Sequence, residues 1–355
     1  MVKEREDNNT KQILLITTGG TIASSDMGNG LTPSMNADVL LSYITDADFK
    51  CNINHISLMN IDSSNMTPDH MCTIADTIAK HYNSYDGFVI THGTDTCAYT
   101  AAALSYMLIN SAKPVIITGS QLPINAKETD AVTNLKNAIY YACENINGVF
   151  VAFNGKLILG TRASKLNTKN ADAFASINAP VIATIKAGSI KYNISSDSEF
   201  HAIFSHRSQD DFHADIGLCP DILTVKLFPG IKSEIFDFAK KNYKAVIIEC
   251  FGIGGIPTQY NNILTKIHEL TEAGIYVVIT TQCLFEGVSL DIYEVGKLLS
   301  NANIIDSGDM TTESITMKLM WALAHCHSND EIVKYMLETI SYDRSNINYA
   351  YRTKT

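Results

Sequence analysis

The sequence lacks any apolar run approaching the roughly 18 residues that span a membrane, and it lacks an excess of positive charge. It holds 27 lysines and arginines against 37 aspartates and glutamates, a formal net charge of −10 at pH 7. Because nucleic acids are bound through clustered lysine and arginine, we expect no nucleic-acid or membrane partner, and instead a small polar ligand. The first ten residues also lack the apolar segment of a signal peptide, so a cytoplasmic location is expected.

Cysteines are few and scattered. The eight of them show neither the paired spacing of a zinc site nor the density of a disulfide scaffold, and most are expected to be small core residues. His325, Cys326 and His327 are consecutive, so on a helix their side chains would point about 100° apart. We therefore expect no metal and no cofactor.

The chain is longer than one hydrophobic core usually supports, so two domains are expected for its 355 residues. Between residues 12 and 151, short β-branched runs alternate with helical segments, which is typical of parallel β-α-β units. Asn154-Gly155, between two apolar runs, predicts a type I′ hairpin at the sheet edge. The expected strands are residues 13–16, 53–58, 88–90, 115–117 and 149–153, and the expected helices begin after Thr67 and cover 101–107 and 131–143.

A polar stretch over residues 195–214 is typical of a linker, and the alternation resumes after it. We expect strands at 222–227, 245–249 and 276–281, helices at 233–241 and 260–272, and mostly helix from Thr311 onward. The predicted fold class is α/β, with two α/β domains. Residues 1–200 would form a larger N-terminal domain with a mostly parallel sheet and an edge hairpin, 201–221 a linker, and 222–355 a smaller C-terminal parallel α/β domain.

Hydroxyl and acidic side chains follow four of the expected strands: Thr21, then Asp62-Ser63-Ser64, then Thr94-Asp95, then Ser120. The carboxyl ends of parallel strands share one edge of a sheet, so these groups can converge on one pocket. Each segment alone is equally typical of an ordinary turn, because glycine, serine, threonine and aspartate are the usual turn residues. The four together favour a functional site.

A threonine hydroxyl is a poor nucleophile that needs a proton acceptor and amide donors for the oxyanion. The glycine turns supply donors. Lys165, held near an acid, could accept the proton, although a solvated loop lysine is the alternative. The turns lack the P-loop and dinucleotide signatures, so nucleotide binding is the weaker hypothesis. His92 has no accompanying nucleophile elbow and could simply pack under its turn.

Residues 17–23 (TTGGTIA) and 86–96 (DGFVITHGTDT) resemble the two signature motifs of the bacterial-type L-asparaginases. The similarity continues through residues 62–68, 113–121, 172–176, 281–283 and 308–311, and so covers nearly the whole chain. The Asp-Ser-Ser sequence and the absence of a signal peptide resemble the cytoplasmic, type I branch.

The resemblance implies an L-asparagine amidohydrolase. Thr21 would attack the side-chain amide of asparagine, giving a β-aspartyl ester and ammonia, and water would then release aspartate. Thr94 and Lys165 would form a second hydroxyl–amine pair. Asp95 would hold the α-amino group of the substrate and orient Lys165.

The resemblance also implies the substrate contacts. Asp62, Ser63 and Ser64 would contact the α-amino and α-carboxyl groups, and Ser120 would lie near the leaving amide. The expected small-molecule partner is L-asparagine, with L-glutamine as a second candidate substrate. Members of this family form homotetramers built from intimate dimers, and each active site is completed by a neighbouring subunit. The resemblance therefore implies a homodimer or homotetramer.

Two positions depart from the family pattern. Leu31 stands where many relatives carry a tyrosine that hydrogen-bonds the nucleophile, and Gly255 stands where relatives often present an asparagine to the neighbouring site. Two alternatives therefore stay open. One is a binding or sensing protein for an acidic amino acid with little turnover, and the other is the glutaminase-like subunit of a tRNA amidotransferase, which usually carries an additional N-terminal domain.

Overall fold

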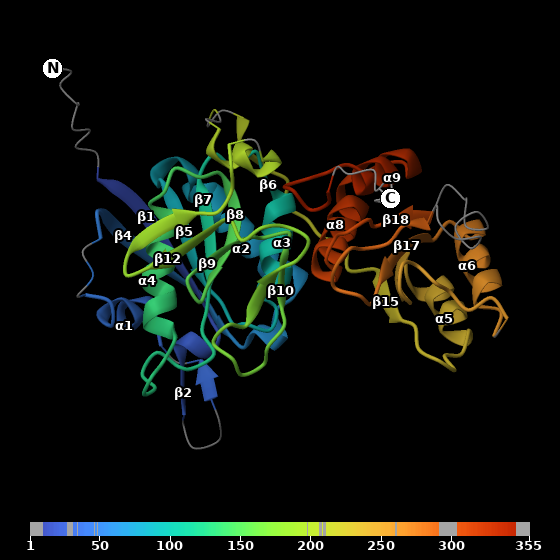
Figure 1. Ribbon diagram of the computed structural model, residues 1–355, viewed down its shortest axis with the longest axis horizontal. Helices are drawn as coiled ribbons and strands as arrows, with labels where there is room; N and C mark the ends of the chain where they lie inside the picture. The colour runs from blue at the N-terminus through green and yellow to red at the C-terminus, as the bar shows by residue number, and fades with distance from the viewer. Residues whose placement is uncertain are drawn as a thin grey trace, which may run out of the picture. The chain divides into compact units, whose positions relative to one another are not determined.

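The computed structural model describes residues 10–26, 31–33, 35–45, 47, 49–196, 198–205, 208, 211–259, 261–290 and 304–345 (Figure 1). The chain divides into two compact units. Unit 1 comprises Met1–Ser176 and Pro180–Ile216, and unit 2 comprises Ile177–Ala179 and Gly217–Thr355. A search of the described residues finds no helix with the length and apolar character that crossing a bilayer requires.

Unit 1 is built on an eight-stranded sheet in the order β13-β12-β9-β8-β7-β5-β1-β4. The five strands from β8 to β4 are parallel to their neighbours, and β9, β12 and β13 add to the sheet antiparallel. The expectation of a mostly parallel sheet with an edge hairpin is confirmed. The strands are β1 (Lys11–Gly19), β4 (Cys51–Ile61), β5 (Gly87–Thr91), β7 (Pro114–Thr118), β8 (Gly148–Phe153), β9 (Lys156–Leu159), β12 (Ala183–Lys186) and β13 (Ser189–Tyr192).

The central strands β5 and β7 are buried along their whole length, as expected where both faces of a parallel sheet are covered. Helices α3 and α4 pack against β7 and β8. Thr67 caps the second helix as predicted, because its hydroxyl accepts the His70 amide hydrogen while the His70 ring accepts the Thr67 amide hydrogen. The helices of unit 1 are α1 (Ala37–Ser42), α2 (Pro68–His81), α3 (Cys97–Met107) and α4 (Ala131–Ala142).

Two hairpins end the parallel part of the sheet. Asn154 (φ 48°) and Gly155 (φ 74°) form the turn between β8 and β9, which confirms the predicted type I′ hairpin. Ala187 (φ 48°) and Gly188 (φ 76°) form the equivalent turn between β12 and β13, which the sequence did not predict. Three short antiparallel pairs complete unit 1: β2 (Ser24–Asp26) with β3 (Leu31–Pro33), β6 (Leu108–Ile109) with β14 (His213–Ala214), and β10 (Ala163–Lys165) with β11 (Phe174–Ser176).

The polar stretch over residues 195–214 falls within unit 1. Glu199–Phe204 form a 3-10 helix in which Phe200 and Ile203 are buried. Phe212 stacks on Tyr82, with ring centroids 3.5 Å apart. Positions 197, 206–207 and 209–210 of this stretch lie outside the described residues.

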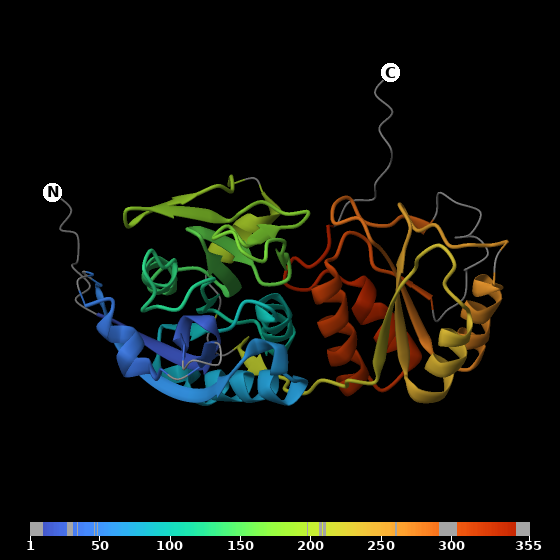
Figure 2. The ribbon, with the colours of Figure 1, turned by 90° about the horizontal axis from the view of Figure 1, so that it is seen from below.

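Unit 2 contains a parallel sheet in the order β15-β16-β17-β18, with a helix pair on each face. Along β16, Val246 and Ile248 face α5 and α6, whereas Ala245 and Ile247 face α8 and α9. Figure 2 shows the two helix pairs on opposite sides of the strands. The elements are β15 (Ile222–Lys226), α5 (Glu234–Asn242), β16 (Ala245–Cys250), α6 (Ile263–Glu272), β17 (Tyr276–Thr281), β18 (Ile304–Asp306), α8 (Thr312–His325) and α9 (Asn329–Leu337), of which β18 was not expected.

Candidate active site

The turns that follow β1, β4, β5 and β7 meet at the carboxyl edge of the unit 1 sheet. A Cβ built on Gly20, where φ is +77°, would lie 2.3 Å from the Gly93 nitrogen. A Cβ on Gly93 would lie 2.4 Å from Ser63 Oγ, and one on Gly119 would lie 2.3 Å from the His92 carbonyl oxygen. Such distances are too short for a side chain, so glycine permits this close packing of backbones. The structure brings together all four predicted turns.

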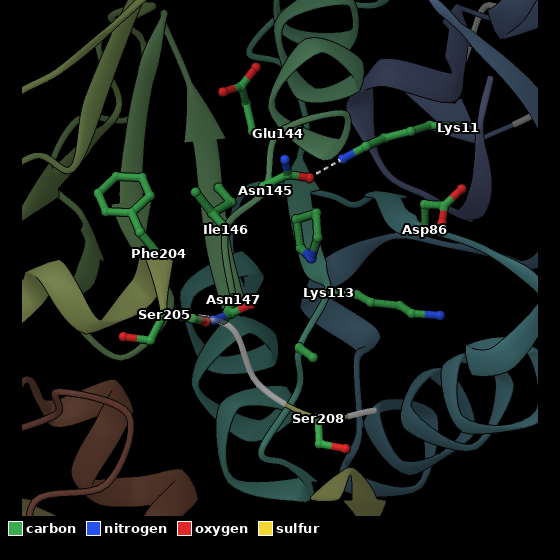
Figure 3. A pocket seen from close by; sticks show the side chains of 12 residues that line it. Lys11, Asp86, Lys113, Glu144, Asn145, Ile146, Asn147, Phe204, Ser205 and Ser208 are labelled. Atoms are coloured by element: carbon green, nitrogen blue, oxygen red, sulfur yellow. Dashed lines mark hydrogen bonds between the residues drawn. The ribbon is translucent and has the colours of Figure 1, made fainter. Parts of the chain in front are cut away.

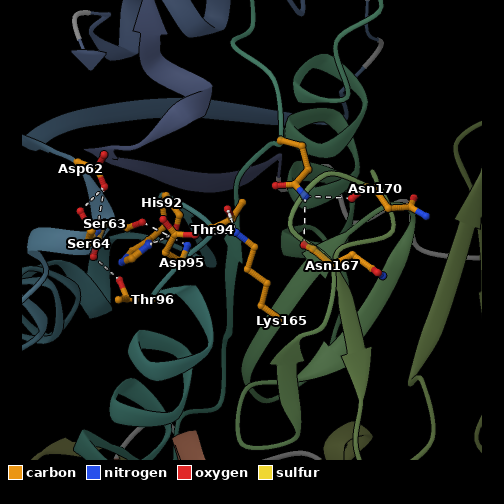
Figure 4. A network of polar contacts seen from close by, with 12 residues as sticks. Asp62, Ser63, Ser64, His92, Thr94, Asp95, Thr96, Lys165, Asn167 and Asn170 are labelled. Atoms are coloured by element: carbon orange, nitrogen blue, oxygen red, sulfur yellow. Dashed lines mark hydrogen bonds and ion pairs between the residues drawn. The ribbon is translucent and has the colours of Figure 1, made fainter. Parts of the chain in front are cut away.

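Hydrogen bonds join the same turns. The Gly20 amide donates to the Ile61 carbonyl at 2.9 Å. The Asp95 amide donates to Ser63 Oγ at 3.2 Å, and Thr96 Oγ1 donates to the Ser63 carbonyl at 2.8 Å (Figure 4). Ser63 is buried and joins the turn after β4 to the turn after β5. Its hydroxyl therefore has a structural contact that the sequence did not indicate.

Lys165 reaches this edge from β10. Its Nζ lies 2.7 Å from Thr94 Oγ1 and 2.7 Å from Asp95 Oδ1 (Figure 4). The Lys165 side chain is 17% exposed, whereas that of Asp95 is 62% exposed. Lysine and threonine are therefore shielded from solvent while the carboxylate is open to it. Of the two interpretations of Lys165 left open by the sequence, the solvated loop lysine does not describe this geometry.

Asp62 and Ser64 form an exposed polar pair at the end of β4. One oxygen of Asp62 accepts hydrogen bonds from the Ser64 amide at 2.8 Å and from Ser64 Oγ at 2.9 Å. Asp62 thereby caps a one-turn 3-10 helix, Ser63–Asn65. Both side chains are accessible at the edge where Asp95 is also exposed.

Thr21 opens a 3-10 turn, Thr21–Ala23, directly after Gly20, and is half-buried. The loop after β7 is tied to this turn because the Ile124 amide donates to the Ile22 carbonyl at 3.2 Å. Ser120, in the same loop, is fully buried and its hydroxyl donates to the Leu122 carbonyl. Thr21 directly follows Gly20, whose backbone packs against the Thr94 turn.

The two departures from the family pattern differ in what the structure describes. The backbone of Leu31 lies in β3, paired with Asp26, but its side chain lies outside the described residues. Gly255 lies in unit 2, where its amide donates to the Phe251 carbonyl at 2.7 Å.

Two residues at the start of α4 were not predicted from the sequence. The Asp130 carboxylate accepts the amide hydrogens of Gln121 at 2.9 Å and Leu122 at 3.0 Å. The Asn134 amide group donates to the Gly119 carbonyl at 3.0 Å. These contacts fix the turn that carries Ser120. An aspartate before a helix resembles an ordinary N-cap, but Asp130 makes no capping bond with its side chain, so its contacts appear only in three dimensions.

His92 lies buried beneath the Thr94 turn. Its Nδ1 is 2.7 Å from the Gly93 carbonyl oxygen, which can only accept, so Nδ1 carries the hydrogen and Nε2 accepts from Thr100 Oγ1 at 2.9 Å. Burial lowers the pKa of His92 to about 4, against the opposing effect of the Gly93 hydrogen bond. The neutral ring supports the turn.

A separate polar pocket of about 610 Å³ opens at the amino edge of the sheet, where β1, β5, β7 and β8 begin (Figure 3). Lys11, Asp86, Lys113 and Glu144 are among its lining residues. None of the predicted site residues lines it. Lys113 donates to the Tyr82 and Tyr85 carbonyls, so its amine has partners within the fold.

Across the described part of the chain, histidine, cysteine, aspartate and glutamate side chains nowhere gather in a group of three or more that could hold a metal ion. Within the consecutive set at 325–327, His325 stacks on Trp321, with ring centroids 4.5 Å apart.

Comparison with protein families gives two matches. A model described as "Asparaginase, N-terminal" matches residues 12–197, and one described as "Glutaminase/Asparaginase C-terminal domain" matches residues 221–336. Together they span most of the chain.

Individual relatives agree. The L-asparaginase of Thermococcus kodakarensis is 37% identical over 331 residues, which are 93% of this chain and 98% of that protein. A solved structure of that enzyme has a TM-score of 0.87, at 36% identity, and the match covers 95% of this chain and 100% of the solved one. L-asparaginase 1 of Escherichia coli is 36% identical, covering 93% of this chain and 97% of the relative. A glutamyl-tRNA(Gln) amidotransferase subunit of Pyrococcus abyssi is 37% identical, covering 92% of this chain and 75% of the relative.

Proposed function

The chain belongs to the asparaginase family, and on that basis we propose that it hydrolyses L-asparagine to L-aspartate and ammonia through an acyl-enzyme formed on Thr21. The observation that carries the proposal is the contact of Lys165 Nζ with Thr94 Oγ1 and Asp95 Oδ1, both at 2.7 Å. A hydroxyl, an amine and a carboxylate joined in this way can move a proton and hold a cationic group.

In the first half-reaction, Thr21 Oγ1 attacks the side-chain carbonyl carbon of asparagine. The hydroxyl proton passes to a basic group, and backbone amides of the glycine turns stabilise the oxyanion. The C–N bond then breaks and ammonia leaves with the transferred proton, which gives a β-aspartyl ester. The packing of Gly20 against Gly93 supports this step because it places the Thr21 turn beside the Thr94 turn.

In the second half-reaction, water attacks the ester and aspartate leaves. Thr94 and Lys165 are suited to activate that water, because the lysine amine contacts the threonine hydroxyl and both are shielded from solvent. An amine in its neutral form can accept a proton through Thr94 and return it to Thr21 Oγ1 as the ester breaks.

The exposed carboxylates are suited to the substrate's α-amino group. Asp95 and Asp62 would bind this ammonium, and Ser64 would bind the α-carboxylate. Ser63 contributes by holding the Asp95 amide, and we retain it as a substrate contact through its backbone or hydroxyl. Ser120 would lie beside the leaving amide, in the loop tied to the Thr21 turn.

The proposal extends to assembly and location. We propose a homodimer or homotetramer that acts in the cytoplasm. This part rests on the resemblance and on the "Probable Cytoplasmic L-asparaginase" of Campylobacter jejuni, a solved structure with 26% identity and a TM-score of 0.76.

The test is ammonia release from asparagine by the purified chain. Thr21→Ala is expected to lower kcat more than about 10³-fold, because the nucleophile is lost. Thr21→Ser, which keeps a hydroxyl, should retain part of the activity. Circular dichroism checks that each variant is folded. Unchanged turnover in a folded Thr21→Ala variant would overturn the nucleophile assignment.

The similarity to the amidotransferase subunit favours a second candidate, a glutaminase-like subunit. Assaying asparagine and glutamine in parallel over a concentration series separates the two functions. Turnover of free asparagine by the chain alone supports the first. Calorimetric binding of aspartate without ammonia release from either amide would instead identify the binding protein considered from the sequence.

A further inference from the structure

Two half-buried cysteines, Cys51 and Cys143, lie together at the amino edge of the unit 1 sheet, opposite the candidate active site. We propose that this pair is a modification site, which a peroxide oxidises to an intramolecular disulfide. Neither cysteine has a part in the proposed hydrolysis, so the inference is independent of that function.

An aromatic contact beside the pair brings the two segments together. The rings of Phe49 and Tyr140 have centroids 5.2 Å apart. Phe49 precedes Cys51 by two residues, and Tyr140 precedes Cys143 by three, less than one helical turn. The start of β4 is therefore fixed against the end of α4.

A polar contact closes the other side of the pair. Lys11 is the register partner of Cys51 on the neighbouring strand, and its Nζ donates to Asn145 Oδ1 at 2.6 Å (Figure 3). Asn145 follows Cys143 by two residues. The two contacts flank the cysteines and join the segments that carry them.

The thiols themselves are hydrogen-bonded. This bond lowers the pKa of the Cys51 thiol, against the effect of its burial, and it raises the pKa of Cys143. Cys51 is thus the acceptor in this hydrogen bond and the more readily ionised of the two thiols, and Cys143 is the donor. Because thiolates are the reactive form, Cys51 is the nucleophile and Cys143 the resolving thiol.

The positions suit bond formation. Cys51 is the first residue of β4, which is an edge strand, and Cys143 is the C-cap of α4. Backbone at the ends of elements adjusts more readily than backbone within them, so the sulfurs can approach to the bonding distance of about 2.05 Å.

The reaction balances with hydrogen peroxide as the oxidant. Cys51 releases its proton to solvent, the resulting thiolate attacks one peroxide oxygen, the O–O bond breaks, and Cys51 becomes a sulfenic acid. The other oxygen leaves as hydroxide, which takes up a proton from solvent and becomes water. The Cys143 sulfur then attacks the Cys51 sulfur, the S–O bond breaks, and a second water leaves with the Cys143 proton. Both thiols are oxidised and one peroxide is reduced to two waters.

The cross-link would close a loop that contains most of the candidate site. Asp62, Thr94, Asp95 and Ser120 all lie between the two cysteines in sequence. A disulfide across a loop of this length stabilises the folded state mainly by restricting the unfolded chain. Oxidation is therefore expected to raise the unfolding temperature of unit 1.

The test uses the reduced full-length protein treated with hydrogen peroxide. We expect the intact mass to fall by two hydrogen atoms, a non-reduced digest to contain the Cys51 peptide linked to the Cys143 peptide, and the unfolding midpoint to rise by several degrees until dithiothreitol is added. In Cys143→Ser, dimedone should trap a sulfenic acid on Cys51, whereas Cys51→Ser should trap none on Cys143.

Cys283→Ser is the matched control because Cys283 is exposed, and this variant should form the cross-link normally. Oxygen added at Cys51 while Cys143 stays free for alkylation would overturn the proposal, as would a mass loss that persists in Cys51→Ser. These readouts are independent of ammonia release, so failure here and failure of the proposed hydrolysis are distinguishable.

Discussion

Gly20 packs directly against the backbone of Gly93, so that a Cβ on Gly20 would lie 2.3 Å from the Gly93 nitrogen. This contact joins two turns that are far apart in sequence and that each end in a threonine. The distance between the Thr21 and Thr94 turns therefore depends on the absence of a side chain at Gly20. A methyl group there would force the turns apart.

Gly20→Ala is expected to destabilise unit 1 and abolish ammonia release. The backbone of Gly20, with φ 77° and ψ −178°, lies in a region that is essentially restricted to glycine, which costs an alanine about 1 to 3 kcal/mol, and displacing the Gly93 backbone adds about 1 to 3 kcal/mol. Urea unfolding measures the total. Gly188→Ala is the matched control, because Gly188 has φ +76° in the same unit but nothing within 4 Å. Equal losses in the two variants would contradict the steric argument.

Lys165→Met is expected to lower kcat about 10²- to 10⁴-fold, because it removes the amine that contacts Thr94 and Asp95. Thr94→Val should have a similar effect. Lys156→Met is the control. Lys156 also forms an ion pair in unit 1, 2.6 Å from Asp172, but it takes no part in the site. A steady-state assay in which both lysine variants lose kcat equally would point to a general structural effect.

Much of the fold could be predicted from local pattern, because β-branched runs alternate with helical segments and Asn154-Gly155 is a strong turn signal. The hairpin at Ala187-Gly188 could not, because alanine rarely adopts positive φ and carries no turn signal. The three-residue strand β18 is too short for periodicity to mark. Its pairing with β17 is visible only in the sheet.

The candidate site could be predicted as a set of residues but not as a set of contacts. Parallel topology implies that the turns share an edge, yet the distance from Lys165 to Thr94 depends on the β10–β11 pair, which no motif indicates. The contacts of Asp130 and Ser63 were likewise hidden, because hydrogen bonds to distant backbone leave no mark on local sequence.

Asp130→Asn should loosen the Ser120 turn. The variant keeps one acceptor oxygen but replaces the other, which accepts from the Gln121 amide and the Asn134 amide group, by an NH2 group, so donor faces donor at a cost of about 1 to 3 kcal/mol. We expect lower kcat/KM as well as lower stability. Asp69→Asn, also at a helix start, should cost less than about 1 kcal/mol and leave kcat/KM unchanged. Normal kinetics for Asp130→Asn would show that this loop does not position the substrate.

Unit 2 contains a fully buried ion pair, in which Lys318 Nζ lies 2.7 Å from Asp343 Oδ2. Asp343→Asn leaves the lysine charge without its counter-ion, so we expect the free energy of unfolding to fall by about 3 to 5 kcal/mol. Lys334→Gln, which breaks the exposed pair with Glu338, should change stability by less than about 1 kcal/mol. Chemical denaturation of both variants checks the contrast, and equal effects would contradict it.

The buried His92 is expected to make the free energy of unfolding depend on pH. Its folded pKa, lowered by burial to about 4, lies below the ordinary value of 6.5, so between these two values the unfolded chain binds a proton that the folded chain does not. Stability from the neutral ring is therefore complete above pH 6.5 and falls as the pH is lowered toward 4. Between pH 7 and pH 5 the free energy of unfolding falls by about 2 kcal/mol because of this group.

Urea unfolding at both pH values tests this. In His92→Gln the fall in stability from pH 7 to pH 5 should be smaller by about 2 kcal/mol, whereas His213→Gln, at an exposed position, serves as the control and should leave the fall unchanged. An unchanged pH dependence in His92→Gln would mean that the pKa of His92 is the same in the folded and unfolded chains, and it would contradict the lowering by burial.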